Sequence, residues 1–211
     1  MLDSSLIYQE KLSPYSREEL MARISDKLDQ PRFEHVKRVE QTAIELAQEN
    51  NVDVEKASVA GLVHDYAKQR SDKDFKHAII QYDLDPDLLN WGNAIWHGVV
   101  GAELIKMELG IYDEDILNAV RYHTTGNTYM TSLAQIVFMA DYIEPGRNFP
   151  GVGVARRLTH HSLQDGVVYQ IASTLSYLVQ RQAKIYPKTI ETYNAWVPSA
   201  STDIKEILNG K

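Results

Sequence analysis

Several ionisable side chains stand in apolar surroundings, where a helix would otherwise bury leucine and valine. His64 and Asp65 come directly after Gly-Leu-Val, and Asp141 comes directly after Val-Phe-Met-Ala. Burying such groups without partners costs roughly several kcal/mol each. A metal ion removes this cost, because neutral imidazole nitrogens coordinate it and carboxylates balance its charge. We therefore interpret His64 and Asp65 as adjacent side chains that both turn inward onto metal.

Three further histidines fall where helical spacing predicts contact with the core. His35 shares a face with Leu46, His97 lies within Ile-Trp-His-Gly-Val-Val, and His123 ends a predicted helix. One buried histidine is more often a hydrogen-bonded core residue than a ligand, but the whole set favours a metal site. The sequence has no cysteine, so the donors are nitrogen and oxygen, which suit a middle transition metal. The candidate ligands are His35, His64, Asp65, His97, His123 and Asp141.

Two basic residues lie close in sequence to these ligands and could contact an anionic substrate. Lys68 comes three residues after Asp65, and we expect one helix to carry both on the same face. Arg147 follows a helix stop at Pro145-Gly146, and its planar guanidinium suits bidentate contact with phosphate. We predict phosphate contacts for both residues, in preference to a solvated surface role.

A polar loop begins directly after His123. Thr124, Thr125 and Gly126 offer hydroxyls and backbone N–H groups that could hold phosphate or ribose. The same residues would serve equally well as a helix end followed by a polar turn, so both interpretations stay open.

The elements that must position these residues are helices, because the apolar spacing is helical almost throughout. Start signals such as Ser16 with Glu19, or Asp53 and Asp113 ahead of apolar periods, open several of them. No apolar–polar alternation is long enough to predict a strand. The sequence therefore predicts an all-α fold. Helices are expected from Pro31, from Asp53, over 73–82, from Asp85-Pro86, over 93–109, over 116–123, over 133–143 after a Ser132 cap, and over 164–185.

Composition narrows the class of protein. The chain has 211 residues, 44% of them hydrophobic, which suffices for one sizeable core. Its formal net charge of −7 excludes the broad basic footprint by which proteins bind nucleic acid. The absence of cysteine excludes disulfides. We expect no signal peptide and no membrane span, and hence a cytoplasmic enzyme or binding protein.

The ordered set of candidate ligands resembles the HD-domain superfamily of metal-dependent phosphohydrolases, in its dinuclear branch. The segments "GLVHDYAK", "WHGVVGAEL", "AVRYHTTG" and "ADYIEPGR" are similar to the YqeK family within it, over roughly residues 20–190. Members of that family are symmetrical dinucleoside-tetraphosphate hydrolases with an HD fold. The HD dipeptide alone is a weak signal, whereas the six ligands in order, with Lys68 and Arg147 beside them, are specific.

The resemblance implies a ligand scheme and a reaction. His35, His64, Asp65 and Asp141 would hold one metal, and Asp65, His97 and His123 the second, with Asp65 bridging. Iron is the implied metal, and manganese or another divalent ion could substitute. A bridging hydroxide would attack an inner phosphate, while Lys68 and Arg147 stabilise the developing charge. Symmetrical cleavage of diadenosine tetraphosphate would then give two ADP.

Three alternatives to this interpretation stay open. The chain could be another HD phosphohydrolase, such as a nucleotidase or cyclic-dinucleotide phosphodiesterase. It could instead be a diiron HD oxygenase with the same ligands, or a nucleotide-binding regulator that keeps the pocket. For organisation, we predict an N-terminal extension over 1–19, an HD domain over 20–190 and a C-terminal tail over 191–211. The apolar late helix could support a homodimer.

Overall fold

The predicted all-α fold is confirmed. The computed structural model describes residues 6–208, and within that range the chain forms helices and no strands. The helices are α1 (Arg17–Ser25), α2 (Gln30–Glu49), α3 (Val54–Val63), α4 (Asp72–Gln81), the 3₁₀ helix η1 (Pro86–Asn90), α5 (Asn93–Leu109), α6 (Glu114–Tyr122), α7 (Ser132–Ile143), α8 (Val152–His161), α9 (Leu163–Gln180), α10 (Pro187–Trp196) and α11 (Thr202–Leu208). Across residues 6–208, none of these helices combines the length and apolarity needed to cross a membrane.

Helix termini follow the local signals in the sequence. Ser16 and Glu19 form the predicted capping box at the start of α1, and Asp53 and Asp113 cap α3 and α6 through their carboxylates. Gly110 ends α5 with φ +64°, a left-handed conformation that favours glycine. These caps fix where each helix begins and ends, and hence where its functional side chains face.

Two predicted helix boundaries are wrong. Thr131, and not Ser132, caps α7, because the Thr131 hydroxyl accepts the Ala134 N–H and Ser132 is already helical. The late helix ends at Gln180 instead of continuing to 185, and Gln182 then turns the chain with φ +51°. The sequence analysis also missed α8, whose capping residue Gly151 offers no side-chain hydrogen bond. The predicted boundary at residue 190 falls inside α10.

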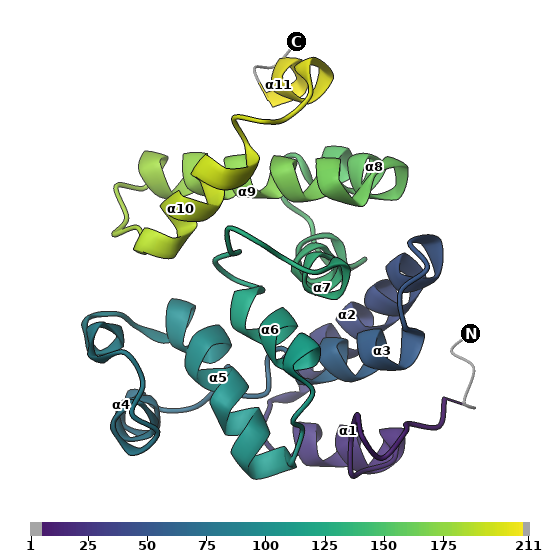
Figure 1. Ribbon diagram of the computed structural model, residues 1–211, viewed down its shortest axis with the longest axis vertical. Helices are drawn as coiled ribbons and strands as arrows, with labels where there is room; N and C mark the ends of the chain where they lie inside the picture. Colours follow the sequence, from purple (N-terminus) through teal and green to yellow (C-terminus); the bar gives the residue numbers. More distant parts are fainter. Residues whose placement is uncertain (1–5, 209–211) are drawn as a thin grey trace.

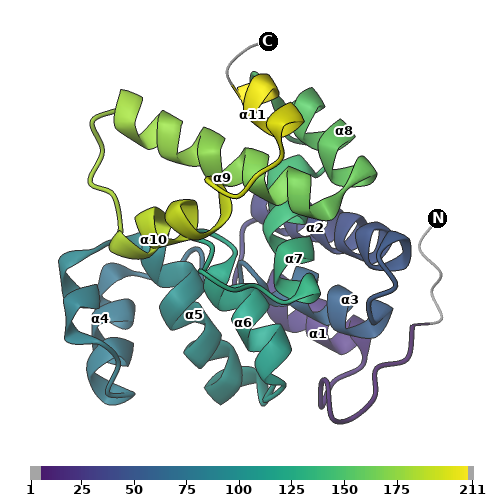
Figure 2. The same ribbon diagram turned by 45° about the horizontal axis from the view of Figure 1, so that its top comes forward.

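The helices form a lower body and an upper layer, which consists of α8, α9 and α10. In Figure 1, α1 to α6 make up the lower body, while α8 and α9 lie across the upper part, with α10 beside α9 and α11 above them. The helix α7 stands between the two and packs against α2, α3, α6, α8 and α9. Figure 2 shows α4, α5 and α6 side by side at the foot of the molecule. Because α7 contacts both parts, its residues reach the centre of the fold.

Two glycines let neighbouring helices approach each other closely. A Cβ atom on Gly61 of α3 would lie 2.8 Å from the Glu40 Cα of α2, closer than side chains tolerate. A Cβ on Gly98 of α5 would lie 3.2 Å from the Val120 carbonyl oxygen of α6. Both glycines therefore have packing roles, and the close pairs α2–α3 and α5–α6 bring histidines from different helices together.

Candidate metal centre

The six predicted ligand residues converge from five parts of the fold into two adjoining groups. His35 of α2, His64 after α3 and Asp141 of α7 form the first group, and Asp65, His97 of α5 and His123 after α6 form the second. Within each group, one donor atom per residue lies within 4.8 Å of the others. Asp65 joins the groups, since its Oδ2 lies 3.6 Å from His64 Nε2 and its Oδ1 lies 3.5 Å from His97 Nε2.

Backbone carbonyls hold three of the four imidazoles in one orientation. His64 Nδ1 lies 2.7 Å from the Gly61 carbonyl oxygen, His97 Nδ1 2.5 Å from that of Asn93, and His123 Nδ1 2.6 Å from that of Val120. Each carbonyl can only accept a hydrogen bond, so the ring proton resides on Nδ1 and Nε2 carries the lone pair. The three rings therefore present metal-binding nitrogens to the centre.

The fourth imidazole is oriented by a carboxylate that the sequence analysis missed. Glu144 is 2% exposed, and its Oε1 lies 3.1 Å from His35 Nδ1. Arg38 Nε donates to the other Glu144 oxygen at 2.6 Å, and the Gly146 N–H donates to the same oxygen. A carboxylate behind a histidine is the usual support for a metal ligand. The only local signal was the acidic residue of the segment Glu-Pro-Gly-Arg.

The donor atoms fit a bound cation. His97 Nε2 and His123 Nε2 lie 3.1 Å apart, and because both carry lone pairs they repel each other without a positive charge between them. His35 Nε2 and His64 Nε2 are buried and make no hydrogen bond within residues 6–208. His35 Nε2 is only 3.1 Å from Asp141 Oδ1, yet the pair lacks hydrogen-bond geometry, as expected for atoms aimed at a shared ion.

Burial keeps the imidazoles neutral. Desolvation, reinforced by His123, lowers the pKa of His97 to about 3, and desolvation with the neighbouring His64 lowers the pKa of His123 to about 4. Burial opposes ionisation of Asp65, but His64, His97 and His123 together hold its pKa below the ordinary value. Neutral imidazoles around ionised carboxylates are the protonation states that metal coordination requires.

Lys68 reaches this centre by a different route from the one predicted. The prediction that one helix carries Asp65 and Lys68 on one face is wrong, because α3 ends at Val63. A tight turn follows, in which the Lys68 N–H donates to the Asp65 carbonyl oxygen at 2.8 Å. The Lys68 ammonium nevertheless lies 3.1 Å from His97 Nε2, and burial lowers its pKa. Its charge is therefore available beside the second group of ligands.

Two arginines contact the carboxylates of the centre. Arg147 Nη2 donates to Asp141 Oδ1, and Arg147 Nε donates to the Asp141 backbone oxygen at 2.8 Å. Arg32, which the sequence analysis did not single out, donates from Nη1 to Asp65 Oδ2 at 2.9 Å. Both side chains are about one-third exposed, at 35% and 30%. They therefore border the centre on a side that solvent reaches.

The loop after His123 connects the candidate site to α10. The Thr124 hydroxyl is buried and makes no hydrogen bond within the described residues, whereas the Thr125 hydroxyl donates to the Gly126 carbonyl oxygen at 3.0 Å. Gly126 has φ +66°, and a Cβ there would lie 2.5 Å from Thr192 Cγ2 of α10. The structure thus gives Thr125 and Gly126 a turn and packing role, and substrate contact by the three residues stays a prediction.

Known proteins are similar to this chain over most of its length. The HD domain family model matches residues 32–146. A Bacillus subtilis protein named bis(5'-nucleosyl)-tetraphosphatase, symmetrical, is 40% identical over 186 residues, which are 88% of this chain and 100% of the relative. A Staphylococcus aureus protein of the same name is 40% identical over 171 residues, covering 80% of this chain and 88% of its own.

A solved structure is similar in fold as well. It is a Clostridium acetobutylicum protein described as a predicted HD superfamily hydrolase involved in NAD metabolism. The two chains superpose with a TM-score of 0.83 at 32% identity, over 88% of this chain and 99% of the other. All six candidate ligands lie within residues 32–146, which the HD domain model matches.

Proposed function

This chain belongs to the HD-domain family, and from that premise we propose that it hydrolyses diadenosine tetraphosphate and related dinucleoside polyphosphates symmetrically, to two nucleoside diphosphates. The proposal is supported by relatives of about 40% identity that carry the name of this activity. The single structural observation that carries it is the convergence of six nitrogen and oxygen ligands in two adjoining groups.

Two divalent metal ions fit these groups, and we propose iron as the native metal, with manganese able to replace it. His35, His64 and Asp141 would hold one ion, His97 and His123 the other, and Asp65 would contact both. When bound, such ions neutralise phosphate oxygens and activate water at neutral pH. An HD domain implies divalent ions, and the donor set, which lacks sulfur, suits iron or manganese.

The remaining roles belong to the charged side chains around the ligands. We propose that Lys68 donates hydrogen bonds to a phosphoryl oxygen beside the second group, since its ammonium already lies 3.1 Å from His97 Nε2. Arg147, beside Asp141, would stabilise charge on the phosphoryl oxygens and on the leaving group. Asp65 orients the centre, because it is 2% exposed and contacts ligands of both groups.

Product analysis tests this function. We would load the protein with ferrous iron or manganese under reducing conditions, add diadenosine tetraphosphate, and separate the nucleotides by ion exchange. ADP as the only product, lost on metal removal, is the expected result. ATP with AMP would retain a metal-dependent hydrolase but refute symmetrical cleavage. Oxygen consumption with an organic substrate and no nucleotide turnover would favour the oxygenase alternative.

A matched pair of histidine variants ties the activity to the site. His123→Ala removes a buried ligand, whereas His77→Ala removes an exposed histidine of α4. We expect loss of activity and of bound metal in the first variant only. A folded His123→Ala protein with parental turnover would refute the proposed centre.

A homodimer also remains a prediction, which sedimentation velocity of the same preparations would test.

A further inference from the structure

A pocket of about 310 Å³ opens beside the first group of ligands, and His35 of that group lines it. Three arginines line it, Arg32, Arg38 and Arg147, and the acidic residues Asp29 and Glu144 also contribute to its wall. We call it the arginine pocket. Three guanidinium groups in one small pocket are unexpected in a chain whose formal net charge is −7. Such a cluster suits a planar or tetrahedral anion with several oxygens.

Each guanidinium is oriented by hydrogen bonds to an acidic residue, and each retains N–H groups that make no hydrogen bond within residues 6–208. Arg38 donates to Glu144 through Nε and Nη2, and Arg147 donates to Asp141 through Nε and Nη2. Arg32 donates to Asp65 through Nη1 alone. A guanidinium carries five N–H donors, so each arginine has donors that no hydrogen bond within residues 6–208 uses. The carboxylates therefore orient the arginines and leave some of their N–H donors available to a ligand.

Arg38 packs directly against the backbone of Gly146 in the wall of the pocket. A Cβ on Gly146 would lie 2.7 Å from both Arg38 Nε and Arg38 Nη2, so the absence of a side chain lets the guanidinium rest on the backbone. Arg156 of α8 fixes the same loop, because it donates to the carbonyl oxygens of Ile143, Glu144 and Arg147 at 2.9 Å each. These contacts position the loop and the Arg38 guanidinium before any anion binds, which lowers the cost of ordering them on binding.

Charge balance couples the pocket to the centre. Arg32 and Arg147 pair with Asp65 and Asp141, the two carboxylates that we propose as metal ligands. Divalent ions on these carboxylates would leave the guanidinium charges uncompensated, so the pocket would favour a polyanion when the centre is loaded. Lys68 serves the second group of ligands, whereas the arginine pocket adjoins the first.

We propose, on the basis of the proposed function, that the arginine pocket binds the diphosphate of one half of the substrate, with Arg32 and Arg38 as specificity residues. The phosphate next to the cleaved bond lies at the metal ions, and the second phosphate of the same half lies among the guanidiniums. This subsite would fix two phosphates on one side of the cleaved bond, and thereby the symmetrical position of the cut in a chain of four.

The ratio of ADP to AMP affinity tests the pocket without turnover. We would measure both dissociation constants by calorimetry on the manganese-loaded full chain, for the parent, Arg32→Gln and Arg38→Gln. Both nucleotides can contact the metals through one phosphate, so incomplete metal loading weakens both together and cancels in the ratio. We expect each variant to lose about tenfold or more of the preference for ADP, as for loss of a charge-assisted hydrogen bond.

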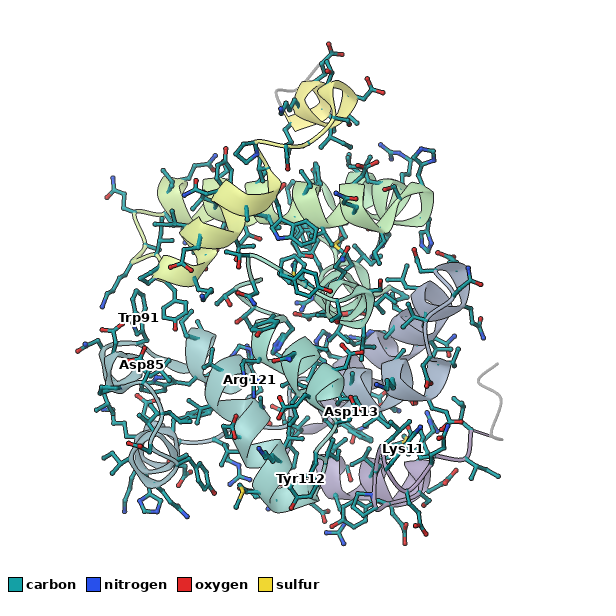
Figure 3. The ribbon with its side chains drawn as sticks, in the orientation of Figure 1. Lys11, Asp85, Trp91, Tyr112, Asp113 and Arg121 are labelled. Carbon is teal, nitrogen blue, oxygen red and sulfur yellow. The ribbon has the colours of Figure 1, made fainter. Side chains whose placement is uncertain are left out.

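Arg121→Gln is the matched control. Arg121 of α6, labelled in Figure 3, is also an ion-paired and partly exposed arginine, with Glu103 at 2.8 Å, but it does not line the arginine pocket. Its ratio should equal that of the parent. An unchanged ratio in both pocket variants would overturn the proposal even if the parent cleaves diadenosine tetraphosphate. A reduced ratio in a parent that cleaves no dinucleoside polyphosphate would instead support the pocket and refute the proposed function.

Discussion

Glu144→Gln tests how the proposed metal centre is held, because this carboxylate contacts the candidate ligand His35 without belonging to the candidate ligand set. Glu144 accepts from His35 Nδ1 at 3.1 Å and from Arg38 Nε at 2.6 Å, and it is 2% exposed. A glutamine keeps the shape but removes the charge, and it accepts through one oxygen only. His35 would then keep a weaker partner or none.

The expected cost follows from this contact. Loss of a carboxylate behind a metal-bound histidine typically weakens metal affinity by roughly 10–100-fold, which is about 1.4–2.8 kcal/mol at about 1.4 kcal/mol per tenfold change. The Arg38 side chain is 38% exposed, so water can solvate the guanidinium once the carboxylate charge is gone. We therefore expect a loss near the lower end, about tenfold.

Chelator competition is the assay. We would titrate manganese against a chromophoric chelator for the parent, Glu144→Gln and the control Glu103→Gln, in which a partly exposed carboxylate paired with Arg121 is changed. Weaker binding in Glu144→Gln alone is expected. Equal affinities in all three proteins would refute the reasoning that Glu144 holds His35 for the metal. Thermal unfolding with excess chelator would show whether any loss reflects general instability.

Three further predictions concern packing, pH and the loop beside the centre. Gly61→Ala should lower the free energy of unfolding by about 1–3 kcal/mol, since its Cβ would lie 2.8 Å from the Glu40 Cα; denaturant unfolding measures this, and a value near zero would contradict it. The chelator-treated protein should lose stability as the pH falls from about 6.5 toward 4. Burial lowers the pKa of His97 to about 3 and that of His123 to about 4. In this pH range the unfolded chain therefore binds more protons than the folded chain, which destabilises the fold. A melting temperature that does not change between about pH 6.5 and about pH 4 would contradict this prediction. Arg156→Gln should lower the melting temperature and raise KM for the dinucleotide, because three carbonyl contacts to the 143–147 loop are lost; steady-state kinetics beside Arg157→Gln, an exposed neighbour on α8, would check it.

The helices could be predicted, and the candidate ligands could be singled out, because their signals are local. Asp53 and Asp113 lie directly beside the helices that they cap, and Asp65 stands in an apolar run that makes an ionisable group conspicuous. The centre itself follows from six such anomalies taken together. What the sequence could not give is the path of the chain between them, as the turn that carries Lys68 shows.

The support around the ligands could not be predicted, because it joins residues far apart in the chain. Glu144 contacts His35 across 109 positions, and Arg38 contacts Glu144 across 106. Neither residue differs locally from an ordinary surface arginine or loop glutamate. Trp91, labelled in Figure 3, is partly exposed, and its ring packs edge-on against that of Tyr186 at 4.9 Å. Such contacts depend on tertiary packing and leave no periodic signal.

The two ways of holding the imidazoles give the centre unequal room for evolutionary change. His64, His97 and His123 are hydrogen-bonded to main-chain oxygens three or four residues upstream, so no side-chain replacement removes the acceptors behind these rings. His35 leans on a side chain, and a substitution at position 144 alters its donor strength directly. Adaptation to a different metal supply therefore has a one-step route at His35, whereas the backbone holds the imidazoles of His97 and His123 in the second group.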